Sequence, residues 1–352
     1  MNTNVRKPSF TSDYMEGAHP DILRRLSKTN LVKTQGYGLD PFSDSAREKI
    51  RRACRCPGAE IHFLTGGTQA NATVIGALLD SYQGVLSSDQ GHINVHESGA
   101  VELGGHKVLT LPNRNGKIDP ADLRRWLADF ENDANHDHMV FPGMVYISHP
   151  TESGTLYTLR ELEEISGICK GNGLPLYLDG ARLAYGLACK ENDVTLPDIA
   201  RLCDVFYIGG TKCGALFGEA VVITRPGLIP HFFTIVKQHG ALLAKGRIAG
   251  LQFDTLFTDD LYFRIGETAI SASDKIRACL REWGYRFYIE SPTNQILVIL
   301  PNDRLESLEE KVEYGFWDKY DEGHTIVRFA TSWATRDEDV DSLLDVLRDL
   351  QR

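Results

Sequence analysis

The chain contains the stretch Leu174-Pro-Leu-Tyr-Leu-Asp-Gly-Ala-Arg182 and, further on, Val205-Phe-Tyr-Ile-Gly-Gly-Thr-Lys212. Each stretch opens with a strand-like apolar run; Asp179 closes the first run and Lys212 follows the second. Parallel strands of an open sheet end at a common crevice, so these two charged groups can meet at one ligand. A pyridoxal phosphate cofactor needs this pair, a carboxylate for its pyridine nitrogen and a lysine amine that carries it as a Schiff base.

Outward from these two stretches, strand-like and helix-like segments alternate along the chain. Helices are expected at residues 44–52 and 67–79. Strands are expected at residues 59–64, 84–87, 107–111, 144–148, 174–178, 205–208 and 220–224. This alternation predicts an α/β fold with a mostly parallel sheet that helices cover on both faces.

The pattern changes after about Gly250. A long helix is expected at residues 269–283, strands at 295–300 and 325–330, and a last helix at 338–350. This order predicts a smaller C-terminal α+β domain. We therefore expect an N-terminal arm (residues 1–30), a large cofactor-binding domain (31–250) and a small domain (251–352).

Composition and charge narrow the class of protein. The 352 residues carry a net charge of -10, which argues against general nucleic-acid binding but leaves room for an anionic small molecule held by local arginines. The N-terminus does not resemble a signal peptide and no apolar run approaches a membrane span, so no membrane partner is expected. Seven scattered cysteines lack zinc-site spacing, so no metal is expected and the reducing cytoplasm is the predicted location.

A glycine-rich element, Thr65-Gly-Gly-Thr-Gln-Ala-Asn71, lies between a predicted strand and a predicted helix. Its glycines would let the backbone approach a ligand closely, and the amides at the start of the helix suit a phosphate. A plain tight turn would have the same sequence, and both interpretations stay open. The element lacks the full G-x-G-x-x-G pattern and the Walker lysine, which excludes those two nucleotide sites.

Five motifs in order resemble those of the threonine aldolase and β-eliminating lyase family. They are Thr65-Gly-Gly-Thr-Gln-Ala-Asn71, Asp89-Gln-Gly-His-Ile-Asn-Val-His-Glu97, Leu178-Asp-Gly-Ala-Arg-Leu183, Gly209-Gly-Thr-Lys212 and Val327-Arg-Phe-Ala-Thr-Ser-Trp333. The resemblance runs from about Ser12 to the C-terminal helix. It implies the fold-type-I (aspartate aminotransferase-like) architecture, the cofactor pyridoxal 5'-phosphate, an amino acid substrate, and a homodimer or homotetramer with shared active sites.

The resemblance also implies roles at the cofactor. Lys212 would carry it, Asp179 would pair with the pyridinium nitrogen, and the imidazole of His92 would stack on the ring. Gly67 and Thr68 would hold the phosphate through backbone amides and a hydroxyl. From residue type alone, Lys212 could be a surface lysine, Asp179 could cap a turn and His92 could be structural.

Further positions match the family at the substrate and between subunits. Arg328 would grip the α-carboxylate, Arg182 would face the same pocket and bind substrate or cofactor, and Ser12 would reach the substrate carboxylate. Lys237 and Arg247 resemble the basic segment that crosses to a neighbouring subunit's phosphate. Structural ion pairs, or a solvated charged helix, are the alternatives.

One departure from the family bears on the reaction. The family's Asn-Thr-His stretch, whose histidine handles the β-hydroxyl, corresponds here to Pro150-Thr-Glu152, and Cys213 also differs from the residue expected after the lysine. A base near His92 or Glu152 would take the β-hydroxyl proton. Glu152 would serve as that base if its pKa were raised, or else face solvent or pair with a lysine. The resemblance implies retro-aldol cleavage of a β-hydroxy-α-amino acid such as threonine or allo-threonine. The alternatives are β-elimination, another amino acid reaction of the same cofactor, or a catalytically silent protein.

Overall fold

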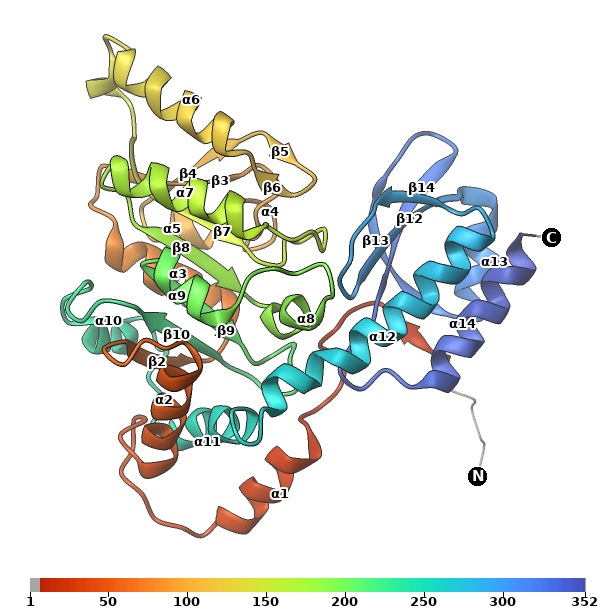
Figure 1. Ribbon diagram of the computed structural model, residues 1–352, viewed down its shortest axis with the longest axis horizontal. Helices are drawn as coiled ribbons and strands as arrows, with labels where there is room; N and C mark the ends of the chain where they lie inside the picture. Colours follow the sequence, from red (N-terminus) through yellow and green to blue (C-terminus); the bar gives the residue numbers. More distant parts are fainter. Residues whose placement is uncertain (1–6, 352) are drawn as a thin grey trace.

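The protein is described from a computed structural model of residues 7–351. The first six residues of the predicted arm lie outside the described residues. Figure 1 shows a large layered body, a smaller body beside it, and helix α12 (Leu261–Glu282) running from one to the other.

The large body is built on a seven-stranded sheet with strand order β2-β10-β9-β8-β7-β3-β4. The strands are β2 (Glu60–Leu64), β3 (Gln83–Ser88), β4 (Lys107–Leu111), β7 (Phe141–Ser148), β8 (Leu176–Gly180), β9 (Val205–Gly209) and β10 (Glu219–Ile223). Only β10 runs against its neighbours; the other six strands are parallel. The predicted α/β sheet is confirmed, and its crevice lies at the carboxyl ends of the parallel strands.

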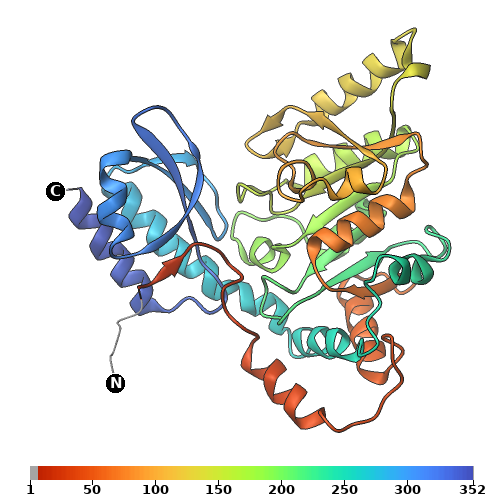
Figure 2. The ribbon, with the colours of Figure 1, turned by 180° about the vertical axis from the view of Figure 1, so that it is seen from behind.

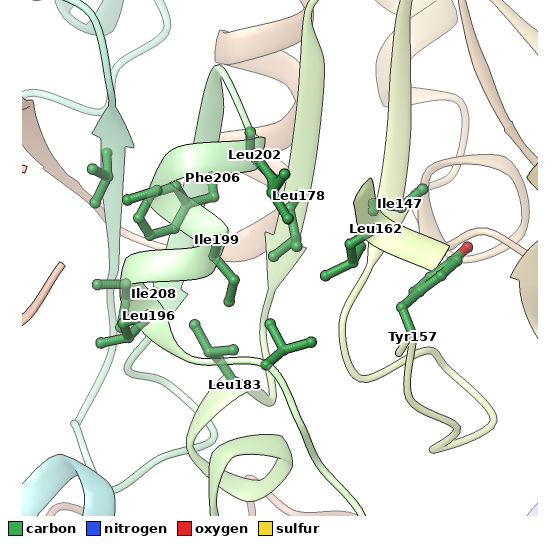
Figure 3. Close-up of a cluster of buried hydrophobic side chains, with 14 of the residues drawn as sticks. Ile147, Tyr157, Leu162, Leu178, Leu183, Leu196, Ile199, Leu202, Phe206 and Ile208 are labelled. Atoms are coloured by element: carbon green, nitrogen blue, oxygen red, sulfur yellow. The ribbon is translucent and has the colours of Figure 1, made fainter. Parts of the chain in front are cut away.

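Helices cover both faces of this sheet, as the views from opposite sides show (Figures 1 and 2). One face packs against α2 (Pro41–Ala53), α6 (Pro120–Asn132), α7 (Leu159–Gly171), α8 (Leu183–Ala188) and α9 (Leu196–Leu202). The other packs against α3 (Gly67–Leu78), α4 (His92–Val95), α5 (Ala100–Leu103) and α10 (Phe232–Gln238). Figure 3 shows Leu162 and Ile199 of the first face directed toward Leu178 and Phe206 of the strands.

Strand alternation assigns each side chain to one face. Leu178 belongs to the core under α7 and α9, whereas its neighbour Tyr177 belongs to the core under α3. Asp179, two residues after Tyr177, therefore points to the α3 face, where the glycine-rich turn lies. The alternation of Tyr177 and Leu178 within β8 thus determines on which side of the sheet a ligand can meet the carboxylate.

The smaller body has a five-stranded sheet with strand order β1-β13-β14-β12-β11. Its strands are β1 (Ser9–Phe10), β11 (Arg286–Ile289), β12 (Gln295–Pro301), β13 (Glu313–Lys319) and β14 (His324–Ala330). Helices α12, α13 (Leu305–Glu309) and α14 (Asp337–Leu350) form a core with one face of it. Residues 9–10 of the arm form a parallel edge strand of this sheet, which the sequence did not indicate.

Most predicted elements are present with shifted ends. The helix expected at 269–283 begins earlier, at Leu261, and the strand expected at 174–178 spans Leu176–Gly180. The remaining elements are α1 (Pro20–Thr29), β5 (Asn113–Arg114), β6 (Lys117–Ile118), η1 (His136–His138), α11 (Arg247–Leu256) and η2 (Asn302–Arg304). The proposed boundary at residue 250 falls within α11, so the division at 30 and 250 stays a proposal. Within residues 7–351, no helix has the length and apolarity needed to cross a membrane.

Candidate active site

A cavity of about 290 Å³ opens at the carboxyl ends of the parallel strands. It is lined by most of the predicted site residues: Gly67, Thr68, His92, Glu152, Asp179, Arg182 and Lys212. A second hollow shares His92, Glu152 and Lys212 with it and adds Arg328. The structure therefore gathers residues from four of the five sequence motifs around one space, together with Arg328 of the fifth.

Asp179 is 3% exposed and accepts four hydrogen bonds. Its donors are the hydroxyls of Tyr146 (2.6 Å) and Tyr207, the Nδ2 of Asn71 (3.1 Å) and the backbone N–H of Ala181 (2.9 Å). Burial alone would raise the pKa of Asp179, but the nearby His92 ring and these tyrosine hydroxyls outweigh it and hold the pKa below the ordinary 3.8. The carboxylate is therefore ionised, as a protonated pyridine nitrogen requires.

The turn that carries Lys212 is held from several sides. The hydroxyl of Tyr262 donates to the carbonyl of Gly209 (3.0 Å), and that of Tyr185 donates to the carbonyl of Lys212. At Gly180 an added Cβ would lie 2.1 Å from the carbonyl oxygen of Tyr207, so β8 and β9 approach at their ends as only glycine allows. This close approach brings the Asp179 and Lys212 segments together.

The glycine-rich turn lies at the start of α3. No side chain caps this helix, so its first amides keep their hydrogen-bonding capacity, and an added Cβ at Gly66 would meet nothing within 4 Å. Since Gly66, Gly67 and Thr68 line the same cavity as Asp179 and Lys212, the phosphate interpretation is favoured over a plain turn. The turn, the ionised acid and the lysine together fit the three ends of pyridoxal phosphate.

His92 is oriented by a buried acid. Its Nδ1 lies 2.7 Å from Oε1 of Glu97, and the same oxygen accepts from Nδ2 of Asn71 (2.7 Å), which also contacts Asp179. Asn71 therefore links the carboxylate of Asp179 to the partner of His92. The ring lines the cavity beside the acid, where a flat cofactor would lie.

Glu152 is 8% exposed, which excludes the solvent-facing interpretation, and within residues 7–351 its carboxylate has no ion pair with a lysine. Its Oε1 accepts from the hydroxyl of Ser148 (2.6 Å) and from the backbone N–H of His92 (3.0 Å). Burial raises the pKa of Glu152, the Ser148 bond opposes this, and the charge of Asp179 adds to the rise. A carboxyl with a raised pKa is a stronger base than an ordinary carboxylate and is suited to accept a proton.

Arg182 and Arg328 differ in their hydrogen-bond partners. Arg182 donates from Nε and Nη2 to Asp13 (2.7 and 3.0 Å), so this edge of its guanidinium group is engaged by the N-terminal segment. Arg328 donates from Nη2 to the carbonyl of Thr11 (2.7 Å), while its buried Nε and the buried Oγ of Ser12 have no partner among the described residues. Arg328 and Ser12 therefore keep unused capacity for an anionic group of a ligand.

Lys237 and Arg247 line neither hollow. The Nζ of Lys237 lies 4.6 Å from the ring centre of Tyr37, and Nη2 of Arg247 donates to the carbonyl of Thr29 (3.0 Å). The structure thus does not bring the predicted cofactor residue Arg247 to this chain's own cavity. The cross-subunit role stays a prediction.

Several residues at the site, in the cavity wall or behind it, escaped sequence reasoning. They are Asn71, Tyr146 and Tyr207, which bond Asp179, and Tyr14 and Glu219, which line the cavity. Tyr146 and Tyr207 offered one usable indication: each lies in a run of buried strand residues, where a hydroxyl needs a partner. Strand pairing then brings Tyr207 directly opposite Asp179.

Comparison with known proteins agrees with this geometry. A family model described as Beta-eliminating lyase matches residues 9–284. A low specificity L-threonine aldolase of Pseudomonas aeruginosa is 28% identical, over 97% of this chain and 96% of that protein. A threonine aldolase structure from Leishmania major has a TM-score of 0.94 at 41% identity, covering 98% of this chain and 99% of that one.

The fold also extends to more distant enzymes. An aspartate aminotransferase of Thermus thermophilus has a TM-score of 0.73 at 17% identity, covering 98% of this chain and 91% of that one. This confirms the predicted aspartate aminotransferase-like architecture. With the motifs, the cavity and these matches in agreement, the chain belongs to the threonine aldolase and β-eliminating lyase family.

Proposed function

We propose that this protein is a pyridoxal 5'-phosphate-dependent carbon–carbon lyase that cleaves β-hydroxy-α-amino acids, such as L-threonine or L-allo-threonine, to glycine and an aldehyde. One observation carries the proposal: ionised Asp179 and Lys212 line one cavity with the buried acid Glu152. The names of the Pseudomonas and Leishmania relatives support the same reaction. When bound, the cofactor would supply the electron sink for the carbanion left by bond cleavage.

The chain's own residues would hold both ligands. Lys212 would carry the cofactor, Asp179 would keep its ring nitrogen protonated, and the amides of the Gly66–Thr68 turn would take its phosphate. Arg328 and Ser12, with unpartnered buried atoms, would take the substrate carboxylate. Holding the carboxylate there would orient the substrate's Cα and so decide which of its bonds the cofactor chemistry would weaken.

The proton of the β-hydroxyl needs an acceptor, and Glu152 lies at the junction of the two hollows. Its carboxylate would accept this proton as the Cα–Cβ bond breaks and the aldehyde leaves. The ring of His92, held by Glu97, would keep the cofactor plane in place rather than exchange protons.

The test is an absorbance spectrum from ~300 to ~500 nm with product analysis, for the wild type and Lys212→Ala. We expect a cofactor band near ~420 nm that the variant lacks, with glycine and acetaldehyde formed from threonine. Pyruvate and ammonia instead would identify a β-eliminating lyase, the reaction after which the family model is named. No band even with added cofactor would refute the whole proposal.

We further propose a homodimer or homotetramer in the cytoplasm. Two observations support this: all seven cysteines are unpaired, as in a reducing compartment, and Arg247 lies outside its own chain's cavity. Mixing inactive Lys212→Ala and Arg247→Ala chains under subunit exchange tests the shared site. Recovered activity is expected, because a mixed dimer has one site with both residues intact; unrecovered activity would exclude the role of Arg247.

A further inference from the structure

Glu219 is a buried acid in the cavity that the proposed reaction does not use. It is 3% exposed and lines the cavity with Lys212 and the glycine-rich turn. Its Oε2 accepts from the backbone N–H of Gly210 (3.0 Å) and its Oε1 from the hydroxyl of Thr211 (2.7 Å). Both carboxylate oxygens are thus bound to the two residues that immediately precede Lys212.

Strand pairing explains this position. Glu219 is the first residue of β10, the one reversed strand, and is paired with Leu64 at the end of β2 and with Gly209 at the end of β9. The glycine-rich turn follows Leu64, and the Lys212 turn follows Gly209. Glu219 therefore stands between the turn proposed for the phosphate and the turn that presents the amine.

The hydroxyl of Thr211 extends the contact. It donates to Glu219 and accepts from the backbone N–H of Gly218 (3.0 Å), so the turn is tied to the residue before the strand as well. The hydroxyls of Tyr185 and Tyr262 donate to the carbonyls of Lys212 and Gly209 in the same turn, but these two side chains are neutral. Among the described side chains that bond residues 209–212, Glu219 alone carries a carboxylate.

Burial raises the pKa of Glu219 to about 7, against the opposing effect of the Thr211 bond and the charge of Lys212. The titratable groups that interact with this carboxyl are Lys212, Asp179, Tyr177, Tyr207, Cys213 and Tyr262. Lys212 is the cation in this set. A negative charge at Glu219 therefore stabilises a positive charge on the Lys212 nitrogen.

We propose that Glu219 is a positioning residue for Lys212: its carboxylate holds the backbone N–H of Gly210 and the hydroxyl of Thr211, and it supplies the counter-charge to the Lys212 nitrogen when the cofactor is held there. This inference rests on the proposed function for the identity of the cofactor. It predicts two separable effects, one from the hydrogen bonds and one from the charge.

The experiment compares Glu219→Gln, Glu219→Ala and a matched control in the cofactor-reconstituted protein. The control is Glu60→Gln, since Glu60 lies at the far end of the β2–β10 pair and its Oε1 accepts from the N–H of Gly227 (2.8 Å) in the same way. Two quantities are measured: the dissociation constant of pyridoxal phosphate, and the pH midpoint at which the visible band of the bound cofactor changes.

Glu219→Ala is expected to weaken cofactor binding about 10- to 100-fold, because two buried donors lose their acceptor. Glu219→Gln keeps the shape of the side chain and is expected to lower the pH midpoint by about one unit, because the counter-charge is removed. Glu60→Gln should match the wild type in both. A midpoint unchanged in Glu219→Gln overturns the inference, even if Glu219→Ala binds poorly.

The outcome is distinct from failure of the proposed function. Wild-type protein that binds no pyridoxal phosphate refutes the function itself, and the inference falls with it. Wild-type protein that binds the cofactor while both Glu219 variants behave like the control refutes only the role of Glu219. Should Glu219→Ala not fold, Glu219→Gln alone decides through the pH midpoint.

Discussion

Replacing Asp13 by asparagine should cost the protein much of its stability, although Asp13 lies in the N-terminal segment near the end of the chain. Its side chain is fully buried and receives Nε and Nη2 of Arg182 from the large body. Nδ2 of Asn294, next to strand β12 of the smaller body, donates to the same carboxylate (2.9 Å). One carboxylate thus ties three separate parts of the chain.

The magnitude follows from what Asp13→Asn leaves behind. The amide retains one acceptor oxygen but directs an NH₂ group at donors of Arg182, whose side chain is only 10% exposed. A buried ion left without its partner costs about 3–5 kcal/mol. The matched control is Asp341→Asn, whose partner Lys275 is 44% exposed and whose loss should cost at most about 1 kcal/mol.

Equilibrium unfolding in urea, with cofactor removed from every variant, measures both losses. The pH dependence adds an independent check. Burial raises the pKa of Asp13, but Arg182 and Lys212 outweigh it, so the folded-state pKa lies below 3.8. The contribution of Asp13 to the free energy of unfolding is therefore complete above its ordinary pKa and disappears as pH falls through its lowered folded-state pKa. The Asp13→Asn variant should not show this loss of stability at low pH. A difference below about 1 kcal/mol between the two variants would refute the reasoning.

Three further outcomes are expected. Arg328→Ala should lower kcat/KM for the amino acid about 10- to 100-fold and leave the cofactor spectrum intact, as steady-state kinetics beside absorbance would show. Glu152→Gln should lower kcat about 100-fold or more and abolish the fall in kcat/KM at low pH, since the pKa of Glu152 is raised and protonation removes the base; an unchanged pH–rate profile would exclude that role. Gly180→Ala should lower the free energy of unfolding by about 3 kcal/mol, because its Cβ would overlap the carbonyl of Tyr207, and a thermal shift near zero would contradict this.

The sequence predicted the large sheet well because the information was local. Buried parallel strands are continuous apolar runs, so β8 and β9 could be located from a few consecutive residues. The ends of the elements were less certain. Helix α12 starts eight residues before the expected position, because packing on the large body, rather than a helical pattern in the sequence, stabilises its first turns. Strand β1, two residues long, has no pattern of its own, since only its partner β13 makes it a strand.

The same contrast between local and distant information applies to the candidate site. Lys212 and Asp179 could be predicted because each follows a recognisable strand and carries a group with specific chemistry. The partners that tune them could not, because Asn71 and Tyr146 lie 108 and 33 residues from Asp179 along the chain. Which donors meet a carboxylate is a property of strand order, and Glu219 shows this most clearly: only the reversed direction of β10 places it beside the lysine turn.

The pKa values of two buried acids in this cavity, Asp179 and Glu152, are shifted in opposite directions, and their hydrogen-bond partners explain why. Asp179 has four donors and the His92 ring beside it, which together overcome the cost of burying its charge. Glu152 has one hydroxyl and one backbone N–H, and it also feels the negative charge of Asp179, so burial prevails. When the environments of two carboxyl groups shift their pKa values in opposite directions, the group with the lower pKa stays charged and the group with the higher pKa can carry a proton. We therefore propose that Glu152 takes the proton-accepting role for which the resemblance implies a histidine, provided that Asp179 remains ionised.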